Sequence, residues 1–157
     1  MELVIGIDPG LARLGYGVIR RDRNIVTPVC YGCLETHANT RSGERLLEIH
    51  TGLVSLFDRY PPAAVAMERL FFSRNVTSAM AVSEVRGIVL LTAEQRGVPV
   101  TEYTPNQVKK AITGSGRADK VQVQNMITRL LGLGEIPQPD DAADALSIAL
   151  CHIHVMR

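Results

Sequence analysis

The chain has 157 residues and 17.2 kDa, with 46% hydrophobic and 21% charged residues and a formal net charge of +1. This length and apolar fraction predict one domain over residues 1–157 and exclude a chain too polar to form a core. Glu2 and Asp8 interrupt the N-terminus, and no stretch has the roughly 18 consecutive apolar residues of a membrane span, so we expect a soluble, cytoplasmic protein without a signal peptide.

The first third of the chain is predicted to form three antiparallel strands. An apolar run over residues 3–7 delivers Asp8 directly before a Pro-Gly turn, which is typical of an inner strand. Two β-rich segments follow over residues 15–20 and 25–31, and Asp22-Arg23-Asn24 between them indicates a hairpin turn.

Helices and strands alternate from residue 42 onward. Apolar residues at helical spacing predict a helix over residues 42–59, and the apolar run 63–67 predicts a strand that delivers Glu68. The remaining predicted elements are a strand over residues 98–103 and helices over residues 75–96, 105–113, 118–131 and 140 onward. Together they indicate an α/β fold, with a mixed five-stranded sheet of three antiparallel and then parallel strands, flanked by helices.

The helix predicted over residues 75–96 contains Gly87 in its interior. A glycine there costs about 1 kcal/mol relative to alanine, so close packing against a neighbouring element or a second subunit would favour it. Small residues at Ala79, Ala81 and Ser83 support such an approach. The alternative is that the apolar face of this helix is simply core packed on the sheet.

Three cysteines do not suggest a secreted disulfide framework. Cys30 and Cys33 have the spacing of a redox or zinc pair, with Cys151 and its neighbouring histidines as the imaginable partner. We favour small buried thiols and expect no zinc site.

The charges are unevenly distributed along the chain. Residues 69–129 hold nine basic and four acidic residues, a net charge of +5, whereas the other segments hold eight basic and twelve acidic residues, a net charge of −4. A basic middle beside acidic strand ends suits a polyanion held over a metal-loaded site. The alternative is that the charges are scattered over solvated helix faces.

Four carboxylates are candidates for one site. Asp8 and Glu68 each follow an apolar strand, and Asp141 and Asp144 are three residues apart, so they share a face of the last helix. Carboxylates held close together repel one another unless a cation is present. Two Mg²⁺ ions would relieve this and support phosphodiester hydrolysis by activating a water and stabilising the leaving oxygen. Taken singly, these acids also fit a helix start stabilised by its dipole and a surface strand end.

Six segments in chain order resemble one family. They are Gly6-Ile7-Asp8-Pro9-Gly10, Met67-Glu68, Phe71-Phe72-Ser73-Arg74-Asn75, Gln107-Val108-Lys109, Asp119-Lys120-Val121-Gln122-Val123 and Asp141-Ala142-Ala143-Asp144-Ala145-Leu146. Together they resemble the RuvC-type Holliday junction resolvases over essentially the whole chain. The resemblance implies a ribonuclease H-like fold, a homodimer, and Mg²⁺-dependent paired nicking of four-way DNA junctions in recombination and repair. It also implies that Mn²⁺ can substitute and that a branch-migration helicase complex is a partner.

The resemblance assigns roles to individual residues. The catalytic and metal-binding acids are Asp8, Glu68, Asp141 and Asp144, and the DNA-binding residues are Phe71, Arg74, Lys109 and Lys120. Asp140 and Asp141 form a tandem, and Asp141 is chosen because it keeps the two-alanine spacing to Asp144, which leaves Asp140 as the helix cap. Without the resemblance, Phe71 also fits a loop hydrophobe at the core edge, and the two lysines fit solvated helix residues.

Two other functions remain open from the residues. A non-catalytic branched-DNA binding subunit would keep the basic surface and lose the acids, but all four acids are present. The phosphate-binding half of an actin-like ATPase also ends its first strand in an acid and a glycine turn, but it needs a second large domain for which this chain is too short.

Overall fold

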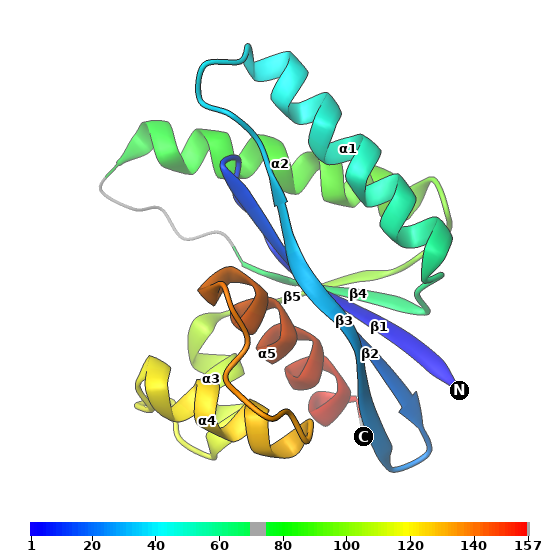
Figure 1. Ribbon diagram of the computed structural model, residues 1–157, viewed down its shortest axis with the longest axis vertical. Coiled ribbons are helices and arrows are strands. Elements are labelled where there is room, and N and C mark those ends of the chain that lie inside the picture. Colours follow the sequence, from blue (N-terminus) through cyan, green and yellow to red (C-terminus); the bar gives the residue numbers. More distant parts are fainter. Residues whose placement is uncertain (70–74, 157) are drawn as a thin grey trace.

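A five-stranded sheet lies between two layers of helices, with α1 and α2 on one face and α3, α4 and α5 on the other (Figure 1). The computed structural model describes residues 1–69 and 75–156. The strands are β1 (Glu2–Asp8), β2 (Arg13–Asp22), β3 (Ile25–Glu35), β4 (Ala64–Glu68) and β5 (Val100–Tyr103). The helices are α1 (Ser42–Arg59), α2 (Val76–Glu94), α3 (Pro105–Thr113), α4 (Lys120–Leu130) and α5 (Asp140–Val155).

The sheet has the mixed topology that the sequence predicts. Its spatial order is β3-β2-β1-β4-β5; β1, β2 and β3 are antiparallel neighbours, and β4 and β5 run parallel to β1. The carboxyl ends of β1 and β4 therefore meet at one edge of the sheet, and Asp8 and Glu68 are the last residues of these two strands.

Alternating side chains divide the interior into two apolar clusters, one on each face of the sheet. Ile5 and Ile7 of β1 pack in the cluster that includes residues of α1 and α2, whereas Val4 packs in the cluster that includes residues of α5. By the same alternation, Gly6 and Asp8 lie on the α5 side of β1. The strand thus directs its terminal carboxylate toward the helix that carries Asp141 and Asp144.

Glycines in β1 and β2 allow α5 to lie very close to the sheet. A Cβ atom on Gly6 would lie 2.0 Å from the carbonyl oxygen of Ala145, and one on Gly15 would lie 2.1 Å from that of Asp141. These neighbours are backbone atoms, which have little room to move aside. The absence of side chains at these two positions therefore determines how close Asp141 comes to the end of β1.

The predicted boundaries are confirmed for several elements, whereas the two predicted strands of the hairpin are shorter than β2 and β3. Helix α1 spans the predicted residues 42–59, and α3 begins with a capping box between Thr104 and Gln107. Strands β2 and β3 are longer than predicted because they pair with each other over nearly their full length. Pro28 is accommodated because β3 is an edge strand and the register shifts between Val18 and Ile19, opposite that region.

The predicted cap of α5 is wrong. Pro139 occupies the N-cap position without a side-chain cap, and Asp140 is the first helical residue. An N-cap carboxylate satisfies the free N–H groups from a non-helical backbone position, which Asp140 does not have. Its carboxylate instead accepts a hydrogen bond from Nε2 of Gln124 at 3.3 Å.

Among the described residues, α2 is the one helix whose length and mean hydropathy would permit it to cross a membrane, and 28% of that stretch is buried. Its interior contains Glu84 and Arg86, which interrupt the apolar run. Its buried residues, including Val85 and Val89, pack on the sheet side. Its other side leaves a large apolar surface exposed within this single chain.

Candidate active site

The carboxyl groups of Asp8 and Glu68 are joined by a hydrogen bond at the edge of the sheet. The register places their strands side by side, with Ile7 of β1 opposite Met67 of β4. Burial, followed by the charge of Glu68, raises the pKa of Asp8 from 3.8 to about 8. The hydrogen bond raises the pKa of Asp8 and opposes the rise in the pKa of Glu68, which burial causes.

Helix α5 brings Asp141 and Asp144 to the same edge. Both carboxylates are near enough to Asp8 to contribute to its raised pKa through charge repulsion. Burial raises the pKa of Asp144, which the Lys120 ammonium partly opposes, and Asp141 adds to the rise. The structure therefore gathers the four predicted acids from three separate elements into one electrostatically coupled group.

Lys120 lies at the side of this group, at the first position of α4. Its Nζ is 3.1 Å from Oδ2 of Asp140 and 3.7 Å from Oδ2 of Asp144. Partial burial lowers the pKa of Lys120, but the hydrogen bond to Asp140 and the charge of Asp144 outweigh this and raise it. Asp140 thus lies on the lysine side of the group, whereas the charge of Asp141 contributes to the raised pKa of Asp8. The pairing of Asp140 with Lys120 was not predicted, because nothing in the local spacing joins residues 20 apart.

A hollow of about 270 Å³ opens beside the acids. Glu68 and Asp144 line it together with Lys109 of α3 and Lys120 of α4. The two lysines predicted to contact DNA therefore border the same space as two of the predicted catalytic acids. An anionic group in this space would meet both ammonium groups and both carboxylates.

The donor set fits a hard divalent cation. Carboxylate oxygens are the ligands that Mg²⁺ and Mn²⁺ prefer, and burial, followed by repulsion between neighbouring carboxylates, raises the pKa values of Asp8 and Glu68; burial also raises that of Asp144. Within residues 1–69 and 75–156, no three histidine, cysteine, aspartate or glutamate side chains converge closely enough to form a finished ion site. The acids lie near one another, with Asp8 and Glu68 hydrogen-bonded.

Two predicted DNA-binding residues, Phe71 and Arg74, lie outside the described residues. They belong to the segment that connects Glu68 to α2, and their roles stay predictions. The sequence interpretation missed the close packing of Gly6 and Gly15 on α5. The sequence does contain a signal for this packing, because glycines inside a strand indicate that another backbone approaches closely.

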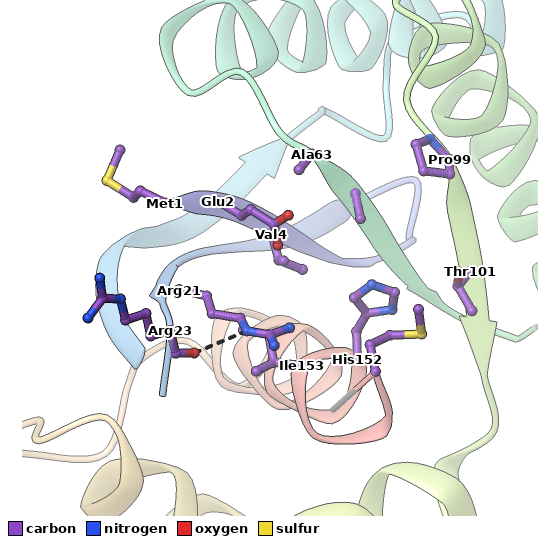
Figure 2. A pocket seen from close by; sticks show the side chains of 12 residues that line it. Met1, Glu2, Val4, Arg21, Arg23, Ala63, Pro99, Thr101, His152 and Ile153 are labelled. Carbon is purple, nitrogen blue, oxygen red and sulfur yellow. Dashed lines mark hydrogen bonds between the residues drawn. The ribbon is translucent and has the colours of Figure 1, made fainter. Parts of the chain in front are cut away.

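A second hollow, of about 630 Å³, lies at the opposite end of the sheet, where β1 begins (Figure 2). Arg21, Arg23 and His152 line it, and Nε of Arg21 donates to the carbonyl oxygen of Arg23 at 3.4 Å. Glu2 is the one acid among the described residues that line it. This hollow therefore lacks a group of carboxylates like the one around Asp8 at the other end of β1.

Comparison with known proteins gives one family. The model of the family described as crossover junction endodeoxyribonuclease RuvC matches residues 4–152. A protein of that name from Desulfitobacterium hafniense is 53% identical over 152 residues, covering 97% of this chain and 92% of the relative. Another from Pseudothermotoga lettingae is 50% identical over 153 residues, covering 98% of this chain and 94% of the relative.

Solved structures agree with this result. The structure described as T. thermophilus RuvC in complex with Holliday junction substrate has a TM-score of 0.96 and 39% identity, covering 100% of this chain and 96% of that one. The yeast mitochondrial Holliday junction resolvase Ydc2 has a TM-score of 0.69 at 16% identity, covering 96% of this chain and 78% of that one, which shows a shared fold.

The fold and the carboxylate edge together define a nuclease with a ribonuclease H-like fold. The chain belongs to the crossover junction endodeoxyribonuclease RuvC family. The family resemblance and the fold class inferred from the sequence are thereby confirmed.

Proposed function

We propose that residues 1–157 form one nuclease domain that resolves four-way DNA junctions. The reaction is paired hydrolysis of phosphodiester bonds in two opposing strands, supported by divalent cations, during recombination and repair. The single observation that carries the proposal is the coupled carboxyl group formed by Asp8, Glu68, Asp141 and Asp144, in which the pKa of Asp8 rises to about 8. Family membership supports the choice of substrate.

Asp8, Glu68, Asp141 and Asp144 would hold the divalent cations, with Mg²⁺ as the expected ion and Mn²⁺ as a substitute. When bound, such ions activate a water and stabilise the leaving oxygen of a phosphodiester. Burial, followed by the charge of Glu68, raises the pKa of Asp8 to about 8. Because carboxylates bind metal ions in their deprotonated form, cation binding at Asp8 would be favoured at higher pH.

Lys109 and Lys120 would position the scissile phosphate, since both border the hollow beside the acids. The proximity of Lys120 to Asp140 and Asp144 keeps its charge at this edge. Phe71, predicted to stack near the junction centre, and Arg74 complete the proposed DNA surface.

The active form is a two-fold symmetric homodimer, because a junction must be cut at two equivalent strands. Helix α2 supplies the best candidate interface. Val76, Met80, Leu90 and Leu91 are 68%, 61%, 42% and 51% exposed, respectively. Gly87 lies between them at helical spacing, and no atom of another described element comes within 4 Å of a Cβ built there. The packing partner that would favour this glycine is therefore a second subunit rather than a neighbouring element.

A branch-migration helicase complex remains a proposed partner, supported by the family resemblance alone. Association with such a complex on a four-way junction, but not on a linear duplex, would support it. A chromosomal DNA substrate favours the cytoplasm as the site of action.

Cleavage of a four-way junction should be compared with cleavage of a linear duplex of the same sequence, with and without Mg²⁺. We expect symmetrically nicked products from the junction in the presence of Mg²⁺ alone. A protein that binds the junction without cutting it under any divalent ion would be a non-catalytic binding subunit. Nucleotide hydrolysis without DNA cleavage would instead favour the actin-like alternative.

A further inference from the structure

Glu102 of β5 lies on the opposite face of the sheet from the acids. It pairs with Met67 of β4, whereas the next residue, Tyr103, pairs with Glu68. Because side chains alternate along a strand, Glu102 shares the α2 side of the sheet with Met67. It therefore lies directly behind the end of the strand that carries Glu68.

Arg86 of α2 forms an ion pair with Glu102 through Nη2 and Oε1. Both side chains are largely withdrawn from water, at 15% and 27% exposure. Nε of Arg86 is buried and has no hydrogen-bond partner among residues 1–69 and 75–156. Burial, with the nearby charge of Arg69, lowers the pKa of Arg86. Glu102 is thus the described carboxylate that compensates this guanidinium.

The other carboxylate oxygen of Glu102 reaches the chain next to the active site. Oε2 lies 3.9 Å from Nε of Arg69, the residue that directly follows Glu68. The backbone N–H of Arg69 also donates to the carbonyl oxygen of Tyr103 at 2.8 Å, which extends the β4–β5 pairing by one residue. Glu102 consequently joins α2 to the backbone immediately after Glu68.

We propose that Glu102 is a positioning residue that, through Arg86 and Arg69, holds the end of β4 so that Glu68 is oriented for divalent-cation binding. The proposal rests on the metal-dependent function proposed above. It also connects the active site to α2, since Arg86 is adjacent to Gly87 on the candidate dimer helix. A substitution at Glu102 should therefore weaken cation binding although its carboxylate faces away from the site.

Substitution of groups that orient metal ligands typically weakens metal affinity by about 10- to 100-fold. We expect Glu102→Gln to weaken Mn²⁺ binding at least about tenfold, measured by calorimetry on the full chain without DNA. The concentration of Mn²⁺ that half-saturates junction cleavage should rise in parallel, while the KM for the junction stays unchanged.

Asp58→Asn is the matched control. Its carboxylate pairs with Arg96, which follows the end of α2, at 2.7 Å, so the substitution also removes an ion pair that anchors α2. Mn²⁺ affinity should be unchanged in this variant. Equal weakening in Asp58→Asn would show that any loosening of α2 has the same effect and would overturn the positioning role.

Arg69→Gln provides a second variant if Glu102→Gln fails to fold. Arg69 is 57% exposed, so its removal leaves no buried charge, and we expect a smaller weakening of Mn²⁺ binding in the same direction. Parent-like Mn²⁺ affinity in both folded variants would overturn the proposal and leave the proposed function intact. A parent protein that binds no Mn²⁺ would overturn both.

Discussion

Asp8 and Glu68 end two neighbouring parallel strands, and their carboxyl groups are hydrogen-bonded to each other at the edge of the sheet. Two events would lower the repulsion between the carboxylates at this edge, namely protonation of a carboxyl group and binding of a cation. Protonation should make the stability of the folded chain depend on pH. Cation binding should make the acids necessary for nicking.

The stability of the metal-free protein should depend on pH through Asp8. The pKa of an aspartate is ordinarily 3.8, whereas that of Asp8 is about 8 in the folded chain. The contribution of Asp8 to the free energy of unfolding is therefore fully present below about pH 4 and is lost as pH rises through about 8. The reason is that the Asp8 carboxyl ionises at lower pH in the unfolded state than in the folded state. Asp8→Asn should unfold at a higher temperature than the parent at pH 8, with little difference at pH 4. Thermal unfolding in a chelator measures both curves, and parallel curves would contradict the raised pKa.

The acids should be required for nicking and dispensable for binding. Asp8→Asn, Glu68→Gln, Asp141→Asn and Asp144→Asn should each lower the cleavage rate by more than about 100-fold, since several kcal/mol of transition-state stabilisation depend on the ions they hold. Junction affinity in Ca²⁺, measured by gel shift, should stay within a few-fold of the parent. Asp140→Asn is the matched control and should retain cleavage, because its carboxylate faces Lys120 rather than Asp8. The assignment of Asp141 is wrong if these two adjacent variants behave in the opposite way.

Lys109→Ala and Lys120→Ala should slow cleavage and reduce the salt dependence of junction binding. Each phosphate contact releases counterions, so the slope of log K against log salt should become shallower by about one per lysine. Fluorescence anisotropy over a salt series gives the slope. Lys110→Ala is a suitable comparison, since Lys110 is an exposed neighbour outside the hollow beside the acids. If the slopes of Lys109→Ala and Lys120→Ala equal that of the parent, the two lysines are solvated helix residues that do not contact phosphate.

Gly87→Leu should weaken the dimer while the monomer stays folded. Overpacking of a close contact costs about 1–3 kcal/mol, which corresponds to a dissociation constant raised about 5- to 140-fold. Sedimentation at micromolar concentration, with circular dichroism to check folding, measures the effect. Gly43→Leu is the control, because Gly43 is a helical glycine in α1 whose Cβ would likewise meet no other described element within 4 Å. A parent protein that sediments as a monomer even with junction bound would rule out the dimer.

Gly15→Ala should destabilise the docking of α5 and lower nicking. Its Cβ would lie 2.1 Å from the carbonyl oxygen and 2.5 Å from the carbonyl carbon of Asp141, so the helix must shift. A cost of about 1–3 kcal/mol is expected for such overpacking, with a melting temperature lower by several degrees. Gly134→Ala, whose Cβ would have no described neighbour within 4 Å, should melt like the parent. Equal melting temperatures for Gly15→Ala and the parent would contradict the close contact between α5 and β2.

Local sequence signals were enough to predict the order and type of the secondary elements. Apolar runs that end at Asp8 and Glu68, the helical spacing over residues 42–59 and the capping box at Thr104 are such signals, and each is confirmed. The choice of Asp141 over Asp140 also came from spacing. The local pattern failed at Asp140, because Pro139 occupies the N-cap position and Asp140 already lies inside the helix.

Tertiary packing, by contrast, established which residues meet across the chain. The contact of α5 with Gly6 and Gly15, the pairing of Lys120 with Asp140 and the link from Arg86 to Glu102 each join residues on different elements. Helical and strand periodicities report which face of an element is apolar, but not the depth or register at which two faces pack. The raised pKa of Asp8 arises from that packing, because burial and neighbouring charges act only once the strand ends and α5 have come together.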